Sequence, residues 1–187
     1  MKHIFKKTIF KNTLLSLGML GLLSACVSVD PNGRGYSFAV PMGMINSTLA
    51  EQFPVQEKRS LGTVEISDPN VLGKQGSDKL AIGTSFKFTN FLIRDGIGGN
   101  LKLASGVRFD PKTQNLYLKN PMVEELKFQN FSLAKYLTPE MKNSLGTIIA
   151  ETIAKKPIYN IKNAGVGSGF VKGIDVRDGQ VYLTFGI

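Results

Sequence analysis

The sequence of 187 residues contains one histidine, one cysteine and no tryptophan, and these absences exclude several kinds of site. His3 lies in an amino-terminal stretch that is typical of a secretory signal. Cleavage of the signal would remove His3, and without a histidine no Ser-His-Asp or Cys-His nucleophile system can form. With the single cysteine modified as well, as described below, the imidazole and thiolate ligands that zinc and copper sites require would be absent. We therefore predict a protein that is not an enzyme and that needs no metal and no cofactor.

Known motifs for phosphate and calcium are also missing. No EF-hand spacing is present, and the glycine-rich residues 165–169 are not followed by the Lys-Ser/Thr of a phosphate loop. A flexible loop is the simpler interpretation of that stretch. Catalysis by carboxylates alone passes these tests, as do sites for Ca²⁺ or Mg²⁺ built from oxygen ligands. No pair of acidic residues has a spacing that favours a shared catalytic site.

Residues 1–25 are typical of a cleaved signal peptide. Lysines precede an apolar run over residues 13–23, and Ser24 and Ala25 then lead to Cys26. The run is shorter than the roughly 18 apolar residues that a membrane-spanning helix needs. The stretch Leu23-Ser24-Ala25-Cys26 resembles the bacterial lipobox, in which a diacylglyceryl group is placed on the Cys thiol before cleavage. The alternative is an ordinary signal peptide with a coincidental cysteine.

The lipobox implies lipid attachment at Cys26 and hence a lipid bilayer as a partner. Two or three acyl chains would give stable anchoring, which one chain does not. Val27 follows the cysteine, whereas an Asp there commonly retains lipoproteins in the inner membrane of enteric-type bacteria. The expected location is therefore the periplasmic face of the outer membrane, with the inner membrane as the alternative.

Cleavage would leave the chain from Cys26 to Ile187, which is long enough for one domain with a real core. Basic residues would fall from 23 to 19 against 14 acidic ones, a net charge of about +5. No run of Lys and Arg accompanies this charge, so we predict no nucleic-acid partner. The charge could favour anionic lipid headgroups or could simply be a solvated surface. We divide the chain into a signal peptide (1–25), a lipidated end with a short tether (26–35) and a single α+β domain (36–187).

Alternating apolar residues predict an antiparallel sheet with one apolar face. The alternation covers residues 61–66, 79–91, 101–109 and 116–128, and a first strand is expected over 36–40. The glycine-rich residues 96–99 suit a tight connection, and Asp178-Gly179 predicts a hairpin that closes the chain.

Asn120 and Glu124 interrupt the apolar alternation of the last strand of this series. Pro121 between them predicts a bulge or an edge position, which would place Glu124 in water. The alternative is a carboxylate at the mouth of a cavity.

Two helices are predicted. Ile45, Leu49 and Phe53 share one side of a short helix near residues 44–53. A second helix covers 139–156, with Thr138 as its cap and an apolar stripe along one side.

Three segments carry a resemblance to a known family. They are Lys172-Gly173-Ile174-Asp175-Val176-Arg177-Asp178-Gly179-Gln180-Val181, then Asn115-Leu116-Tyr117-Leu118-Lys119, and the helix leading to Lys156-Pro157-Ile158-Tyr159. With the lipobox, they resemble the YceB-like family of bacterial periplasmic lipoproteins. The resemblance implies a TULIP-like fold, related to tubular lipid-binding modules. In it a long helix lies in a strongly curved antiparallel sheet, and the groove between them can hold a lipid chain.

We therefore predict a membrane-anchored protein that binds a phospholipid, a fatty acid or another apolar ligand. The candidate lining residues are Leu80, Ile82, Phe86, Phe88, Leu101, Leu103, Leu116, Leu118 and Met122 of the sheet, with Leu145, Ile149 and Ile153 of the helix. For each of them, ordinary core packing is the alternative. The alternative function is a structural or adaptor lipoprotein with a filled core and an exposed apolar patch.

Overall fold

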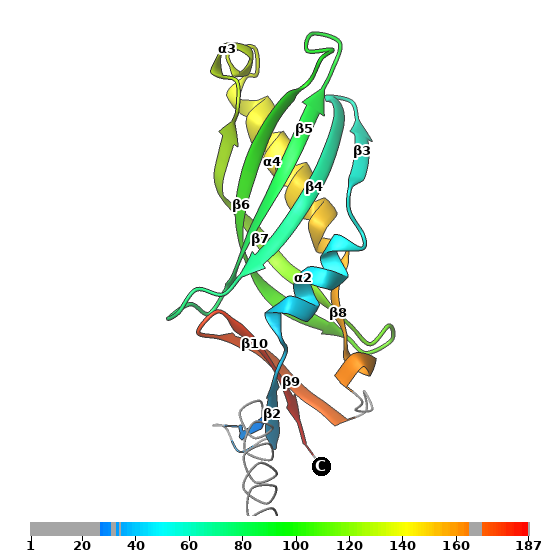
Figure 1. Cartoon of the computed structure of the whole chain (residues 1–187), viewed down its shortest axis with the longest axis vertical. Coiled ribbons are helices and arrows are strands. Elements are labelled where there is room, and N and C mark those ends of the chain that lie inside the picture. Colours follow the sequence, from blue (N-terminus) through cyan, green and yellow to red (C-terminus); the bar gives the residue numbers. More distant parts are fainter. Residues whose placement is uncertain (1–26, 31–32, 34, 165–169, 187) are drawn as a thin grey trace, which may run out of the picture.

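A computed structural model describes residues 27–30, 33, 35–164 and 170–186, and it shows an α+β chain built mostly from two antiparallel sheets (Figure 1). The predicted signal peptide, Cys26 and residues 165–169 lie outside the described residues. In chain order, the elements are β1 (Val27–Val29), β2 (Tyr36–Ala39), α2 (Met42–Ala50), β3 (Val55–Arg59), β4 (Gly62–Leu72), β5 (Leu80–Thr89), β6 (Ile97–Asp110), β7 (Asn115–Phe128), α3 (Phe131–Ala134), α4 (Pro139–Ala154), β8 (Pro157–Asn160), a 3-10 turn (Ile161–Ala164), β9 (Val171–Arg177) and β10 (Gln180–Phe185).

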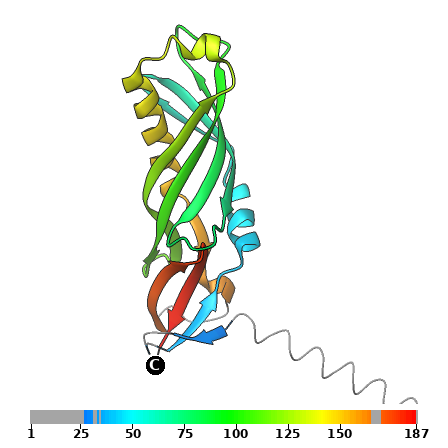
Figure 2. The same cartoon turned by 90° about the vertical axis from the view of Figure 1, so that its left-hand side faces the viewer.

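The larger sheet has the order β3-β4-β5-β6-β7-β8, and every neighbouring pair is antiparallel. It is strongly curled, and α4 lies along one of its faces (Figures 1 and 2). The predicted meander corresponds to β4, β5, β6 and β7 and is confirmed. Strands β3 and β8 were not predicted, because such short strands carry too little alternation of apolar and polar residues.

The helix α4 begins as predicted and ends at Ala154, slightly before the predicted end. The Thr138 hydroxyl accepts a hydrogen bond of 3.2 Å from the backbone N–H of Met141, and Pro139 occupies the first turn. Lys155 caps the other end, and Pro157 starts β8. Pro157 therefore ends the helix and also opens an edge strand, a place in a sheet where proline is tolerated.

The helix α2 starts at Met42, earlier than predicted, and ends at Ala50. Ile45 and Leu49 are fully buried, whereas Phe53 lies beyond the helix and packs against the core only in part. The side chain of Asn46 attaches α2 to β4, since its oxygen accepts from the Val71 N–H at 2.7 Å and its nitrogen donates to the Val71 carbonyl at 3.2 Å.

The predicted bulge beside Pro121 is present, and it corrects the prediction for Met122. Lys119 pairs with Gly106 and Met122 pairs with Ala104, so β7 has one more residue than β6 in this interval. Asn120 within it has a φ angle of 50°. The extra residue exchanges the two faces of the strand beyond it. The Met122 side chain is consequently 52% exposed, and its predicted place among the apolar lining residues is wrong.

A second bulge follows at Glu124. Leu103 pairs with Val123 while Lys102 pairs with Glu125, so Glu124 is an extra residue on β7, and it is exposed as predicted. This bulge exchanges the faces of the strand again. Val123 and Leu126 therefore both lie on the side of β7 that faces α4, although an odd and an even position would normally point apart.

The predicted tight connection at residues 96–99 is wrong, since β6 begins at Ile97. Gly98 and Gly99 belong to the strand, and Phe86 of β5 is the cross-strand partner of Gly99. A Cβ atom at Gly99 would lie 2.4 Å from the ring of Phe86. Glycine is therefore used here to admit an aromatic ring, and the turn itself lies in residues 90–96.

The smaller sheet has the order β1-β2-β10-β9 and lies at the end of the molecule opposite α3 (Figures 1 and 2). Its β9–β10 hairpin is confirmed. Asp178 and Gly179 have φ angles of 50° and 69°, as the two central residues of a tight hairpin turn require. A Cβ atom at Gly179 would lie 2.1 Å from the Lys74 nitrogen, so this position requires glycine. Strand β1 falls within the residues predicted as a tether and pairs with β2.

One apolar core joins α2, α4 and both sheets. Val181 and Leu183 of the smaller sheet belong to the same buried cluster as Leu101 and Leu116 of the larger one. The backbone also connects the smaller sheet to the turn after β4, since the Gly179 N–H donates to the Ser77 carbonyl at 2.8 Å. The two sheets therefore share a single interior.

Candidate functional site

A groove runs between α4 and the outer edge of β7. Strand β8 pairs with β7 only at Asn115, Leu116 and Tyr117. Among the described strands, none pairs with that edge of β7 beyond Tyr117. The groove there offers about 730 Å³, within the range of small-molecule sites. The lining residues are Arg108, Leu118, Lys119, Asn120, Pro121, Val123, Leu126, Lys142, Asn143, Gly146, Thr147, Ala150, Glu151, Ala154 and Lys155.

The side of α4 that lines this groove carries small residues, whose side chains do not fill it. Gly146, Ala150 and Ala154 follow one another at intervals of four, so they share one side of the helix. A Cβ atom at Gly146 would lie 3.2 Å from Cγ2 of Val123, which shows how closely helix and strand approach there. With Leu118, these residues give the groove an apolar floor.

The rim of the groove is basic. Four cationic side chains line it, and Glu151 is the one acidic residue among the lining residues. The cations are Arg108, Lys119, Lys142 and Lys155. Within the described ranges, none of the four has a carboxylate within ion-pair distance. Two of them make cation–π contacts. The Arg108 guanidinium lies 4.5 Å from the centre of the Tyr117 ring, and the Lys142 ammonium lies 5.9 Å from the centre of the Phe128 ring.

The lysines near the Glu124 bulge are arranged differently. Lys102 and Lys127 contact the two oxygens of Glu125 at 2.9 Å and 2.6 Å. Hydrogen bonds from Lys127 and then from Lys102 hold the pKa of the Glu125 carboxyl below its usual value. These cations already have an anionic partner, and such exposed pairs contribute little to stability. The cations of the groove have no such partner among the described residues.

Strand β8 buries a further polar group. The hydroxyl of Tyr159 has no hydrogen-bond partner among the described residues, and burial raises the pKa of this phenol. Tyr159 pairs with Leu116 in the core and does not border the groove. It therefore stays a neutral core residue at physiological pH, with no part in the site.

The residues predicted to line a groove lie mostly in the core. Eleven of the twelve are 3% exposed or less, and Met122 lies on the opposite face of β7. Leu118 is the one member of the set that also borders the groove. The buried members are Leu80, Ile82, Phe86, Phe88, Leu101, Leu103, Leu116, Leu118, Leu145, Ile149 and Ile153.

Most of the groove was therefore not predicted. The strongest sign of it in the sequence is the spacing of small residues at 146, 150 and 154, directly beside the apolar stripe of α4. The cationic rim comes from β6, β7, α4 and the residue that caps this helix, and no local pattern unites its members.

The described residues contain neither a cluster of metal ligands nor a membrane-spanning helix. No group of three or more His, Cys, Asp or Glu side chains gathers there in a way that could hold a metal ion. Across the same residues, no helix has both the length and the apolar character needed to cross a membrane.

A comparison with known families identifies residues 43–180 as a match to the family described as "Protein of unknown function (DUF1439)". The match covers α2 except for its first residue, and it includes α4, the whole larger sheet and strand β9. No curated protein matches the sequence.

Proposed function

The chain belongs to the DUF1439 family, whose function is unknown, and we propose that it is a membrane-anchored lipoprotein that binds a lipid or another apolar ligand in the groove between α4 and β7. The observation that carries this proposal is the open groove itself, with its floor of Leu118, Val123 and small helix residues. Apolar side chains with a few polar groups at the rim are what small-molecule sites present.

The dimensions of the groove suit an acyl chain. Its lining on α4 runs from Lys142 to Lys155, a stretch of helix that spans about 20 Å. An acyl chain in one leaflet occupies about 15 Å, half of the hydrocarbon thickness of a bilayer. The helix against a strongly curled sheet also supports the TULIP-like arrangement that the resemblance to YceB-like lipoproteins implies. In this proposal the protein carries or presents its ligand and is not an enzyme.

The membrane anchor in this proposal is an acylated Cys26 at the periplasmic face of the outer membrane. We expect Cys26→Ala to abolish incorporation of labelled palmitate and to leave a precursor that retains its signal peptide, because the modified thiol is required for cleavage. Metabolic labelling and intact-mass measurement of the full chain check this. If the wild-type chain carried no added lipid mass, this would contradict the anchor but not ligand binding in the groove.

Photocrosslinking tests the ligand. A benzophenone amino acid is placed at Val123 of the full chain in bacterial cells, since Val123 lines the groove and contacts α4. The matched control carries the same group at Lys112, an exposed turn residue outside the groove. After irradiation, crosslinked peptides are identified by mass spectrometry.

We expect an acyl-containing adduct at position 123 and none at position 112, because only the groove brings a ligand into contact with the probe. Irradiation dependence separates this adduct from any lipid on Cys26. Equal labelling at both positions, or no lipid adduct at position 123, would contradict lipid binding in the groove.

One observation favours the adaptor as a second candidate function. Phe91 and Leu92 are 80% and 63% exposed at the turn between β5 and β6. Asn90 orders this turn, because its side-chain oxygen accepts from the Leu92 and Ile93 N–H groups at 3.0 Å and 2.8 Å. An ordered turn that exposes two large apolar residues is typical of a contact surface. A protein adduct from a probe at Phe91, with no lipid adduct at Val123, would favour this function.

A further inference from the structure

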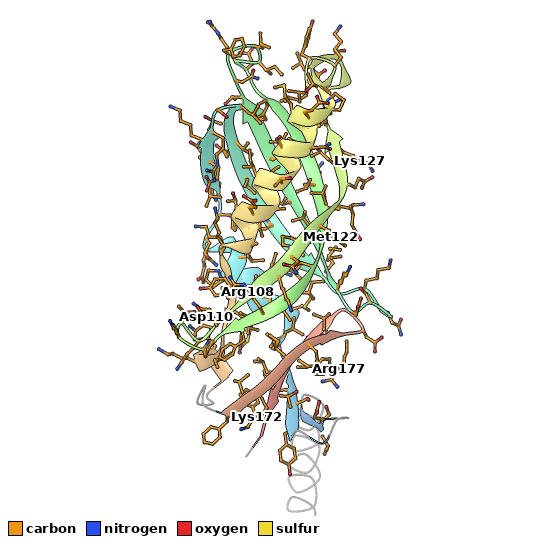
Figure 3. The ribbon with its side chains drawn as sticks, turned by 180° about the vertical axis from the view of Figure 1, so that it is seen from behind. Arg108, Asp110, Met122, Lys127, Lys172 and Arg177 are labelled. Atoms are coloured by element: carbon orange, nitrogen blue, oxygen red, sulfur yellow. The ribbon has the colours of Figure 1, made fainter. Side chains whose placement is uncertain are left out.

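The basic rim of the groove is concentrated at one end by the pairing of three strands. Arg108 of β6 pairs with Tyr117 of β7, and Tyr117 pairs with Pro157 of β8. Lys119 lies two positions beyond Tyr117, and Lys155 lies two positions before Pro157. All three cations therefore line the groove near the end of α4 from which β8 leaves, where Figure 3 shows Arg108.

We propose that the ligand of the groove is an anionic amphiphile whose acidic headgroup binds Arg108, Lys119 and Lys155. This inference rests on the proposed function, because it assigns the chemical class of the ligand in that same groove. The acidic group is a carboxylate or a phosphate monoester or diester. A fatty acid would supply the first and a phospholipid the second.

The charges at this end favour an anion. Arg108, Lys119 and Lys155 line the same groove, are exposed and form no ion pair with a described carboxylate. Glu151 lies one helical turn before Lys155 and can offset one of them. Asp110 follows on β6 outside the groove lining. Its carboxylate accepts from the Lys112 backbone N–H at 2.9 Å, and its attraction to Arg108 offsets part of that charge. A surplus of positive charge therefore remains in the groove.

Arg108 is suited to recognise a planar or tetrahedral acid. Its guanidinium lies 4.5 Å from the centre of the Tyr117 ring, and this contact limits the orientations of the side chain. A guanidinium held in this way can donate two parallel hydrogen bonds to a carboxylate or a phosphate. The lysines supply further charge without a fixed geometry.

The rest of the groove gives the ligand a direction. From Lys155, the small helix residues Ala154, Ala150 and Gly146 lead along the floor toward Leu126. The far end has one cation, Lys142, which lies over the ring of Phe128. An acyl chain would follow the apolar floor away from the three cations. The headgroup would then stay at the open, solvated end beside β8.

Three photoreactive probes test this inference on the full chain in isolated bacterial membranes. They are a diazirine-labelled hexadecanoic acid, the hexadecanol of the same length and a diazirine-labelled phosphatidic acid. The test variant is R108Q/K119Q/K155Q, which removes three charges from the rim. The matched control is K58Q/K87Q/K112Q, which removes three charges from exposed positions outside the groove.

We expect at least one of the two acids to label groove peptides about tenfold more than the alcohol in the wild-type chain, the size of one charge-assisted contact. That preference should disappear in R108Q/K119Q/K155Q and persist in K58Q/K87Q/K112Q. It should also persist in K119R/K155R, which keeps the charge at both positions. Circular dichroism of R108Q/K119Q/K155Q establishes that a loss is not caused by misfolding. The acid that labels more strongly identifies a carboxylate or a phosphate as the headgroup.

Two other outcomes would overturn the inference. Equal labelling by acid and alcohol in the wild-type chain, or a preference that survives R108Q/K119Q/K155Q, would overturn the headgroup assignment alone and leave lipid binding in place. Absence of groove labelling by all three probes would overturn both this inference and the proposed function.

Discussion

Thr147→Trp is expected to reduce lipid labelling at the groove by tenfold or more while the protein stays folded. Thr147 lies on the exposed side of α4 and lines the groove, so an indole there would occupy space that the proposed ligand needs. Leu118 also borders the groove but is 2% exposed, and a change there would disturb the core as well. A tenfold loss of affinity corresponds to about 1.4 kcal/mol, a modest cost for steric overlap with a bulky ring.

The yield of the crosslink from position 123 measures this effect, with Ser144→Trp as the matched control. Ser144 is a half-buried residue of the same helix that does not line the groove. Thermal unfolding followed by circular dichroism would establish that both variants are folded. Undiminished labelling in folded Thr147→Trp would place the ligand elsewhere and contradict the proposed groove.

Phe86→Ala is expected to lower the free energy of unfolding by about 3–5 kcal/mol, the range for removal of a buried aromatic side chain. Phe86 is 3% exposed and lies over Gly99, which has no side chain to fill the resulting space. Its ring also meets Phe128 edge-on, with ring centres 5.6 Å apart. For a chain of this size, each kcal/mol lowers the midpoint of thermal unfolding by about 2–4 °C.

The same substitution at Phe91 provides the control, because that side chain is 80% exposed. Phe91→Ala should change the free energy of unfolding by no more than about 0.5 kcal/mol. Circular dichroism of the full chain in mild detergent measures both variants. Similar midpoints for Phe86→Ala and Phe91→Ala would show that the contact between Phe86 and Gly99 does not stabilise the sheet.

Local chemistry made much of the fold predictable. The Asp178-Gly179 turn and the Thr138 cap each depend on residues within a few positions, and the structure has both. The alternation that predicted β4 to β7 is likewise a property of each strand alone. The bulge beside Pro121 was predicted from that proline and its polar neighbours, yet Met122 was still assigned to the apolar face. A bulge moves the side chain of every later residue in its strand to the opposite face of the sheet.

The groove was harder to predict, because it depends on how far apart two elements lie. The apolar faces of α4 and the sheet were identified, but their side chains pack against each other and leave no space for a ligand. The groove lies beside this packed region, at the edge of β7. Which strand ends the sheet is decided by the short pairing of β8 with β7, two segments that are distant in the sequence. Arg108, Lys119 and Lys155 become neighbours only through that pairing.

The pairing of β1 with β2 has a mechanical consequence for a protein held at Cys26. A flexible segment of about ten residues would have a root-mean-square reach of about 18 Å, and the protein could rotate and rise on it. Val27 pairs with Phe38 and Val29 with Tyr36, so residues 27–29, directly after the cysteine, are held in the smaller sheet. An anchor at that cysteine would therefore hold the smaller sheet close to the bilayer, with no long flexible segment between them. The length of the folded body, and not a flexible linker, would then set the distance between the bilayer and the groove.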